Sequence, residues 1–197
     1  MLRRILFAVL FFTVAVAQTG PSRPYAIDNN HSTVGFSVSI MNGLSKVTGK
    51  FTDFAITLTN DEQDITKSSV GVVIKTASIN TGIAARDNHL RTPDFFDAEK
   101  YPEITFQSSR IEKKGKQITV FGTFTMHGVS KELALPFTVI GPNKNTAGDK
   151  MNFGYAAHIT LNRRDFGINW QHKTVPNFVG DNVEVDIELI TKAIDVK

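Results

Sequence analysis

Apolar and polar residues alternate with a period of two over most of the chain, and this pattern constrains the fold more than any other feature. Successive side chains of a β-strand point to opposite faces, so each alternating run predicts a strand with one buried face. The clearest runs cover residues 34–40, 118–126, 133–139, 151–161 and 183–189. Less regular strands are expected around residues 25–28, 46–58, 69–79 and 103–111.

Short turns rich in Gly, Asn, Asp and Lys, such as "KKGK" and "HGVSK", separate these segments. Eight or nine strands joined in this way predict an antiparallel sheet, because parallel pairs need long crossovers. The apolar face must be hidden in a sandwich or a barrel, and the pattern alone leaves both open. A membrane-embedded barrel is disfavoured, because the polar face carries full charges, no aromatic girdle is evident and the chain ends in the charged "DVK".

The first 17 residues have the three-part order of a secretory signal peptide. Two arginines precede an apolar run that ends in "AVA", an A-x-A-like cleavage site, before Gln18. The run is shorter than the roughly 20 apolar residues that a membrane-spanning helix needs. We therefore expect cleavage near Ala17, one mature domain over residues 18–197 that does not span the membrane, and a periplasmic or secreted location.

Removal of this segment changes the charge balance of the protein. Taking its two arginines from the 22 Lys and Arg of the chain leaves 20 basic residues against 19 acidic ones, a net charge of +1. Such a chain has no electrostatic reason to bind nucleic acid. The chain also contains no cysteine, which excludes disulfides, thiolate catalysis and Cys-ligated metals.

One charged stretch, "RDNHLRTPDFFDAEKYP", interrupts the strands. Helical spacing predicts a helix over residues 83–91. Thr92, followed by a proline and an aspartate, predicts the N-cap of a second helical turn. We expect this excursion to cover an end or a wall of the barrel, with Leu90, Phe95 and Phe96 inward and its charges outward.

Four segments carry a resemblance to a known family: "YAIDNNHSTVGFSV", "RDNHLRTPDFFDAEKYPEITFQS", "GTFTMHGVSKEL", and "LNRRDFGI" followed by "VGDNVEVDIEL". In this order, and over nearly the whole mature chain, they resemble the successive signatures of the YceI-like family. The resemblance implies an all-β, eight-stranded antiparallel lipocalin-like β-barrel with a short helical excursion between strands, exported to the periplasm. It also implies a long apolar ligand inside, such as a polyisoprenoid, an isoprenoid quinone or a fatty acyl compound. A barrel of eight strands is either filled by side chains or holds one small ligand.

The inward parity of the strands and the excursion supply the candidate ligand-binding residues. They are Phe36, Val38, Ile74, Leu90, Phe95, Phe96, Phe106, Phe124, Met126, Phe137, Phe153 and Tyr155. Flat rings suit an unsaturated chain, although core packing is the default interpretation of any one ring. Polar contacts are expected from Arg86, Asp87, His89 and Arg91, and Arg163 and Arg164 are further candidates for holding a head group.

The five histidines lack the spacing of a metal site, and no G-x-S-x-G segment or phosphate-binding glycine loop occurs. No catalytic residue, metal or cofactor is therefore predicted. His31 and His127 are expected to anchor strand ends through hydrogen bonds, and Asp87 and Asp165 to pair with nearby arginines.

Three functions stay open at this point. A carrier of an apolar ligand is favoured over an enzyme acting on a lipid or quinone and over a solid-core stress or adhesion protein without ligand. Association into a homodimer is also left open.

Overall fold

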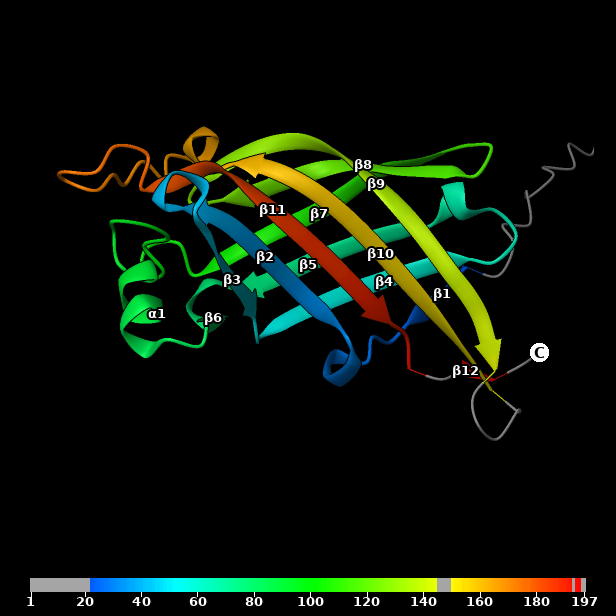
Figure 1. The fold of residues 1–197 in the computed structure, drawn as a ribbon. Helices are drawn as coiled ribbons and strands as arrows, with labels where there is room; N and C mark the ends of the chain where they lie inside the picture. The colour runs from blue at the N-terminus through cyan, green and yellow to red at the C-terminus, as the bar shows by residue number, and fades with distance from the viewer. Residues whose placement is uncertain (1–21, 145–149, 193, 196–197) are drawn as a thin grey trace, which may run out of the picture.

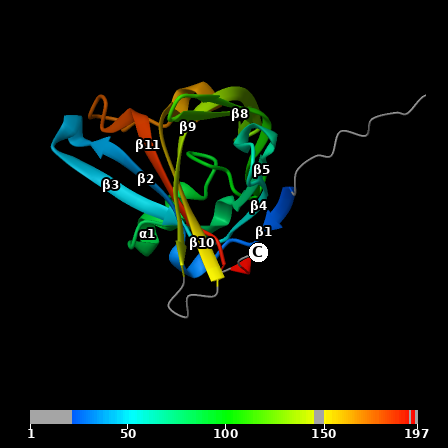
Figure 2. The same cartoon turned by 90° about the vertical axis from the view of Figure 1, so that its right-hand side faces the viewer.

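A computed structural model of the protein describes residues 22–144, 150–192 and 194–195. Its strands form one antiparallel sheet that curls into a half-barrel (Figure 1 and, turned by 90°, Figure 2). The strands are β1 (Ser22–Tyr25), β2 (Thr33–Ile40), β3 (Ser45–Phe51), β4 (Phe54–Asp61), β5 (Ser69–Lys75), β6 (Ile79–Asn80), β7 (Glu103–Lys114), β8 (Gln117–Met126), β9 (Val129–Lys144), β10 (Lys150–Asn162), β11 (Val179–Ile190) and β12 (Ile194–Asp195). Within these residues the helices are α1 (Ala84–Leu90) and the 3-10 turns Asn29–His31, Met41–Gly43, Ile65–Lys67, Thr76–Ser78 and Arg163–Phe166.

The strand order is β1-β4-β5-β7-β8-β9-β10-β11-β2-β3-β6, with β12 beside β10. The two sides of this order are joined where β3 bends into β4. Pairing continues across the bend, since Thr52 N donates to Ser78 O (3.2 Å) and Lys75 N donates to Asp53 O (2.9 Å). A second closure joins the segment after β1 to the end of β11, where Lys192 N donates to Ala26 O (2.7 Å). The sheet thus wraps around an interior toward which one face of every long strand points.

The turn between β8 and β9 shows how local sequence sets this register. His127 (φ 52°) and Gly128 (φ 76°) take the left-handed conformations of a two-residue hairpin turn whose twist matches that of paired strands. The turn pairs Met126 with Val129 and so keeps the apolar positions of both strands on the inner face. A one-residue slip would turn this whole set outward.

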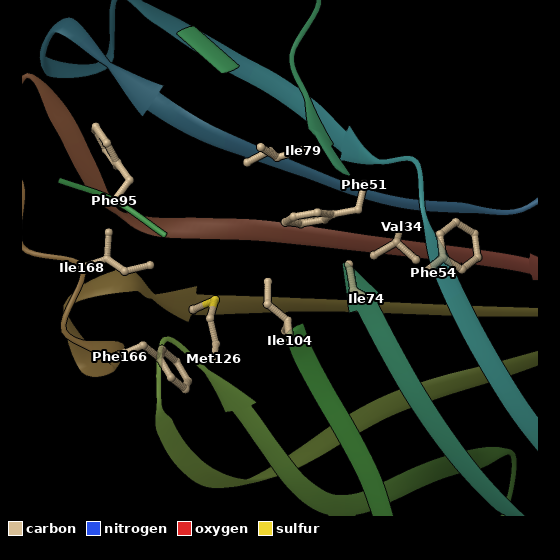
Figure 3. Packing of buried hydrophobic residues seen from close by; sticks show 10 residues of the cluster. All are labelled: Val34, Phe51, Phe54, Ile74, Ile79, Phe95, Ile104, Met126, Phe166 and Ile168. Atoms are coloured by element: carbon tan, nitrogen blue, oxygen red, sulfur yellow. The ribbon is translucent and has the colours of Figure 1, made fainter. Parts of the chain in front are cut away.

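The largest buried cluster lies in the half of the barrel next to α1. Figure 3 shows its ten buried members, which come from opposite walls and from the loops at this end: Val34, Phe51, Phe54, Ile74, Ile79, Phe95, Ile104, Met126, Phe166 and Ile168. Two further clusters fill the half of the barrel away from α1. One centres on Tyr25, Ile27, Leu58 and Tyr155, and the other on Phe106, Ile111, Ile118 and Val120.

The predicted all-β, antiparallel, barrel-like fold with a helical excursion is confirmed. The described sheet has twelve strands rather than eight, because bends such as the one between β3 and β4 divide long segments and because short strands join at the edges. The predicted helix over 83–91 is α1, which is one residue shorter at each end. The predicted signal peptide, residues 1–17, lies outside the described residues.

The second predicted helical turn is wrong. Residues after Thr92 form successive turns, in which Phe95 N and Asp97 N both donate to Thr92 O. The Thr92 hydroxyl donates to the carbonyl oxygen of His89 (2.7 Å). It therefore satisfies a free carbonyl at the end of α1 instead of capping the start of a new helix.

Candidate ligand-binding cavity

The half of the barrel next to α1 contains a cavity of about 430 Å³. Its walls come from β2, β3, β5 and β7 to β11, and the excursion between β6 and β7 covers it. Among the described residues the lining side chains are apolar or aromatic except those of Arg86, His89, Thr105 and Arg163. Ligand pockets of roughly 300 to 1,000 Å³ with few polar groups are typical of small-molecule sites, so the cavity can hold an apolar ligand.

Nine of the twelve predicted apolar residues line this cavity: Phe36, Val38, Ile74, Leu90, Phe95, Phe96, Phe106, Phe124 and Met126. Strand positions two residues apart contribute Phe36 and Val38 from β2, and Phe124 and Met126 from β8. Phe96 contacts Phe51 edge-on, with ring centroids 6.1 Å apart. The residues that alternation assigned to the inner face and those of the excursion thus meet around one space.

Phe137, Phe153 and Tyr155 point into the barrel but do not line this cavity. Phe137 stacks on Tyr155 (5.4 Å, 16°), and Phe153 packs on Tyr25 (5.4 Å) in the filled half of the barrel. The residues after Tyr25 cross to β11 there, which narrows the interior until side chains occupy it. Burial raises the pKa of Tyr155 above its usual range, and its hydroxyl has no hydrogen-bond partner within the described residues.

A buried carboxylate fixes the start of the excursion. Asp87 Oδ1 accepts hydrogen bonds from Thr81 N (2.9 Å) and Thr81 Oγ1 (2.5 Å), and Arg86 donates to Thr81 Oγ1 (2.7 Å) and Thr81 O (3.0 Å). Burial opposes ionisation of Asp87, but the bonds from Thr81 and the charges of Arg91 and Arg86 outweigh it and hold its pKa below the usual range. Asp87 therefore orients Thr81. Among the described residues no arginine forms an ion pair with Asp87, and Arg91 and Arg86 act on it only through their charge.

Arg91 joins α1 to the barrel. Its guanidinium donates to Ala77 O (2.7 Å), Ile79 O (2.9 Å) and Asn88 Oδ1 (3.0 Å). Ile79 belongs to β6, so these bonds tie the end of the helix to the sheet. Neither Arg91 nor Asp87 lines the cavity, whereas Arg86 and His89 do.

Aromatic rings gather around His89 at the cavity. Its ring contacts Phe95 (5.1 Å) and Trp170 (5.8 Å) edge-on, and its Nε2 lies 2.7 Å from Asp94 Oδ2. Phe95 and Trp170 also contact each other (5.2 Å). The excursion and the loop before β11 are thereby held together across the end of the barrel.

Arg163 is buried in the wall at the same end. Its guanidinium donates to Ile168 O (2.7 Å), Gly180 O (3.0 Å), Val179 O (3.3 Å) and Asp181 Oδ1 (3.0 Å). Burial lowers the pKa of Arg163, and Asp181 opposes this shift. Because most of its N–H donors already have acceptors, this guanidinium holds the backbone around it in place and has few donors left for a ligand.

The partner predicted for Asp165 is wrong. Asp165 pairs with Lys131 (2.9 Å), and Asp181 is the carboxylate that contacts both Arg163 and Arg164. The reason is that Asp165 lies in a 3-10 turn on the outer side, 54% exposed, whereas Asp181 enters β11 beside the two arginines.

The histidines show no metal site. In the described part of the chain no group of three or more His, Asp or Glu side chains could hold a metal ion. His31 Nδ1 lies 2.9 Å from Asp28 Oδ2, and His127 Nδ1 lies 3.0 Å from Phe166 O, so both histidines anchor strand ends as predicted.

Comparison with known proteins agrees with this architecture. Residues 25–191 match the YceI-like domain. The chain belongs to the YceI-like family. Protein YceI of Escherichia coli O157:H7 is 35% identical over 166 residues, which cover 83% of this chain and 84% of that protein.

Two solved structures resemble this YceI-like chain. The YceI protein of Campylobacter jejuni is 32% identical and matches with a TM-score of 0.65 over 78% of this chain and 87% of its own. A polyisoprenoid-binding domain from Saccharophagus degradans, 17% identical, matches with a TM-score of 0.61 over 86% of this chain and 98% of its own, and so shares the fold. No helix in the described residues of the YceI-like chain is long and apolar enough to cross a membrane.

Sequence reasoning missed three aromatic residues of this YceI-like cavity, and one of them, Phe51, lines it from the end of β3. Trp170 and Phe178 line it from the loop before β11, where no periodic pattern exists. One available signal was that the single tryptophan of the chain stands in an otherwise polar stretch, "NWQHK".

Proposed function

We propose that the protein binds one long apolar chain in its cavity and carries or stores it without converting it. The observation that carries this proposal is the cavity of about 430 Å³, which lies inside a curled sheet and is lined almost entirely by apolar and aromatic side chains. Proteins close-pack their interiors, so a ligand that fills a hollow of this size gains dispersion contacts that the empty hollow lacks. Membership of the YceI-like family and the fold shared with a polyisoprenoid-binding domain support the ligand class: a polyisoprenoid, an isoprenoid quinone or a fatty acyl compound.

The proposal extends to where and how the protein acts. In this proposal the working protein begins near Gln18 after cleavage of the signal peptide and acts in the periplasm or outside the cell. It acts as a monomer or a homodimer and binds neither nucleic acid nor a cofactor. N-terminal sequencing of the protein from a periplasmic fraction tests the location. An intact Met1 in a membrane fraction would contradict it.

The binding test is extraction of lipid from protein purified without detergent, followed by native mass spectrometry. The wild type should carry about one ligand per chain. Met126→Asp should empty the cavity, because an unpaired charge there costs several kcal/mol. Thr125→Asp is the matched control, since Thr125 faces outward on the same strand and bonds Ser130. If both folded variants retained the full ligand content, the cavity would not be the binding site.

An enzyme acting on a lipid or quinone is the second candidate, and one observation favours it. His89 lines the cavity and forms a hydrogen-bonded pair with Asp94, an arrangement that can serve as a general base. Among the described lining residues, however, no serine or tyrosine stands ready as a nucleophile. Incubation of the wild type and His89→Gln with the extracted lipid distinguishes the two: the carrier proposal expects the lipid mass to stay unchanged with both.

A further inference from the structure

Exposed apolar side chains gather at the cavity end of the barrel. Five large apolar residues are exposed in the described part of the chain, and four of them, Met41, Leu44, Ile83 and Val175, lie at this end. Leu44 is 84% exposed. Figure 1 shows the β2–β3 turn beside the loop before β11 at the left-hand end, with α1 below them. Single exposed apolar residues are ordinary, but a group at one end indicates an interaction surface.

Two of these loops are joined and ordered. Met41 N donates to Phe178 O (2.8 Å), and Leu44 N donates to Met41 O (3.2 Å). In the other loop His172 Nδ1 accepts from Val175 N (3.2 Å), and its ring packs on Phe178 (5.0 Å). The backbone therefore holds Met41, Leu44 and Val175 toward solvent, and internal packing does not account for their apolar character.

The charges of the two loops that carry Met41, Leu44 and Val175 have one sign. Residues 38–48 and 166–180 contain no Asp or Glu, and their lysines, Lys46 and Lys173, are both exposed. The carboxylates that flank residues 166–180, Asp165 and Asp181, are already paired with basic side chains. An apolar centre with a basic rim complements the anionic head groups and acyl chains of a lipid bilayer.

The cavity reaches this surface. Ile40 and Phe178, which line the cavity, are each within three residues of Met41 or Val175 in the chain. The geometry points to a membrane-docking surface at which Met41, Leu44 and Val175 enter the head-group layer of an anionic bilayer while Lys46 and Lys173 contact phosphate groups. A ligand could then pass between bilayer and cavity without crossing water. That use rests on the proposed function, whereas docking itself does not.

Flotation with vesicles of phosphatidylcholine, with and without phosphatidylglycerol, tests the docking. Met41→Ser/Leu44→Ser should lower the vesicle-bound to free ratio about tenfold, because apolar area no longer enters the bilayer. Ile140→Ser is the matched control, since Ile140 is also exposed (51%) but lies on β9 at the far end. All variants keep the same N-terminus, so differences between them report this surface.

The charge requirement has its own pair of variants. Lys46→Gln/Lys173→Gln should weaken binding to phosphatidylglycerol vesicles about tenfold or more. Lys113→Gln/Lys116→Gln, in and beside the β7–β8 turn at the far end, should bind as the wild type does.

Equal binding of the Met41→Ser/Leu44→Ser and Ile140→Ser variants to the vesicles would overturn the proposal. The proposal would also fail if the Met41/Leu44 variant bound vesicles as the wild type does but lost a dimer that the wild type forms in sedimentation velocity. The surface would then join two copies of the chain. Lipid extraction from the same samples separates this proposal from the function. A wild type that docks through Leu44 but contains no lipid refutes the carrier alone, and a lipid-loaded wild type that binds no vesicles refutes docking alone.

Discussion

Replacing Arg163 by methionine should destabilise the protein far more than the same change at Arg164. Both arginines contact Asp181 Oδ1, Arg163 at 3.0 Å and Arg164 at 2.6 Å, but their side chains differ in exposure, 5% against 33%. Methionine keeps much of the apolar stem in each case. The comparison therefore isolates the guanidinium and its surroundings.

The magnitude follows from the bonds that are lost. Arg163→Met leaves the carbonyl oxygens of Ile168, Val179 and Gly180 without this donor and removes one of the two cations beside Asp181. A buried polar group left without a partner costs about 1 to 3 kcal/mol, so the loss of these bonds should lower the free energy of unfolding by about 3 to 5 kcal/mol in all. Asp181 adds little, because it is 40% exposed and keeps Arg164 beside it. Arg164→Met breaks a partly exposed pair, which is worth about 0 to 1 kcal/mol.

Urea unfolding followed by far-ultraviolet circular dichroism measures both free energies by linear extrapolation. The expected loss for Arg163→Met is a large part of the roughly 5 to 15 kcal/mol that stabilises a typical domain. The free energy of unfolding of Arg163→Lys should lie between those of Arg163→Met and the wild type, because lysine restores the charge but not the planar set of donors. If Arg163→Met cost no more than Arg164→Met, the saturated guanidinium would not be what holds β11 to the preceding turn.

Three further predictions concern the excursion and the sheet. Phe95→Ala should lower the free energy of unfolding by about 3 to 5 kcal/mol, because Phe95 is only 8% exposed. Phe96→Ala removes a half-buried ring on the cavity and should reduce the extractable lipid more than the stability. If both variants kept the melting temperature and the lipid content of the wild type, the two rings would not act as apolar plugs. Folding lowers the pKa of Asp87, so its contribution to stability is complete above about pH 4 and is lost as the pH falls through the pKa of the folded state. In urea titrations between about pH 5 and about pH 2, the free energy of unfolding should therefore fall more steeply for the wild type than for Asp87→Asn. Parallel curves for the two proteins would contradict this. Gly122→Ala should lower the free energy of unfolding by at least about 1 to 3 kcal/mol, since a Cβ there would clash with the Gln107 carbonyl oxygen of the facing strand and lie 2.8 Å from Ser108 Cα. Gly71→Ala, whose Cβ meets only a flexible side chain at 3.0 Å, should cost clearly less in the same assay.

The sequence by itself determined the strands, their inner faces and the excursion. Period-two alternation is a local property, so it predicted β8 with Phe124 and Met126 on the inner face before any partner strand was known. The excursion was recognisable because its composition breaks this pattern, and its apolar residues Phe95 and Phe96 do line the cavity. Turns that need left-handed backbone, such as that of His127 and Gly128, fixed the register of a hairpin in the same local way.

Only the tertiary structure decided which inward residues surround a space and which fill one. Phe124 and Phe137 share the same parity signal, yet Phe124 lines the cavity and Phe137 stacks on Tyr155, because the chain crosses from β1 to β11 at that half of the barrel. The pairing of Arg163 with Asp181 and the placement of Trp170 likewise depend on how the loop before β11 packs. Alternation states only toward which face a side chain points. The distance to the opposite wall is set by the curvature of the whole sheet, which no local pattern encodes.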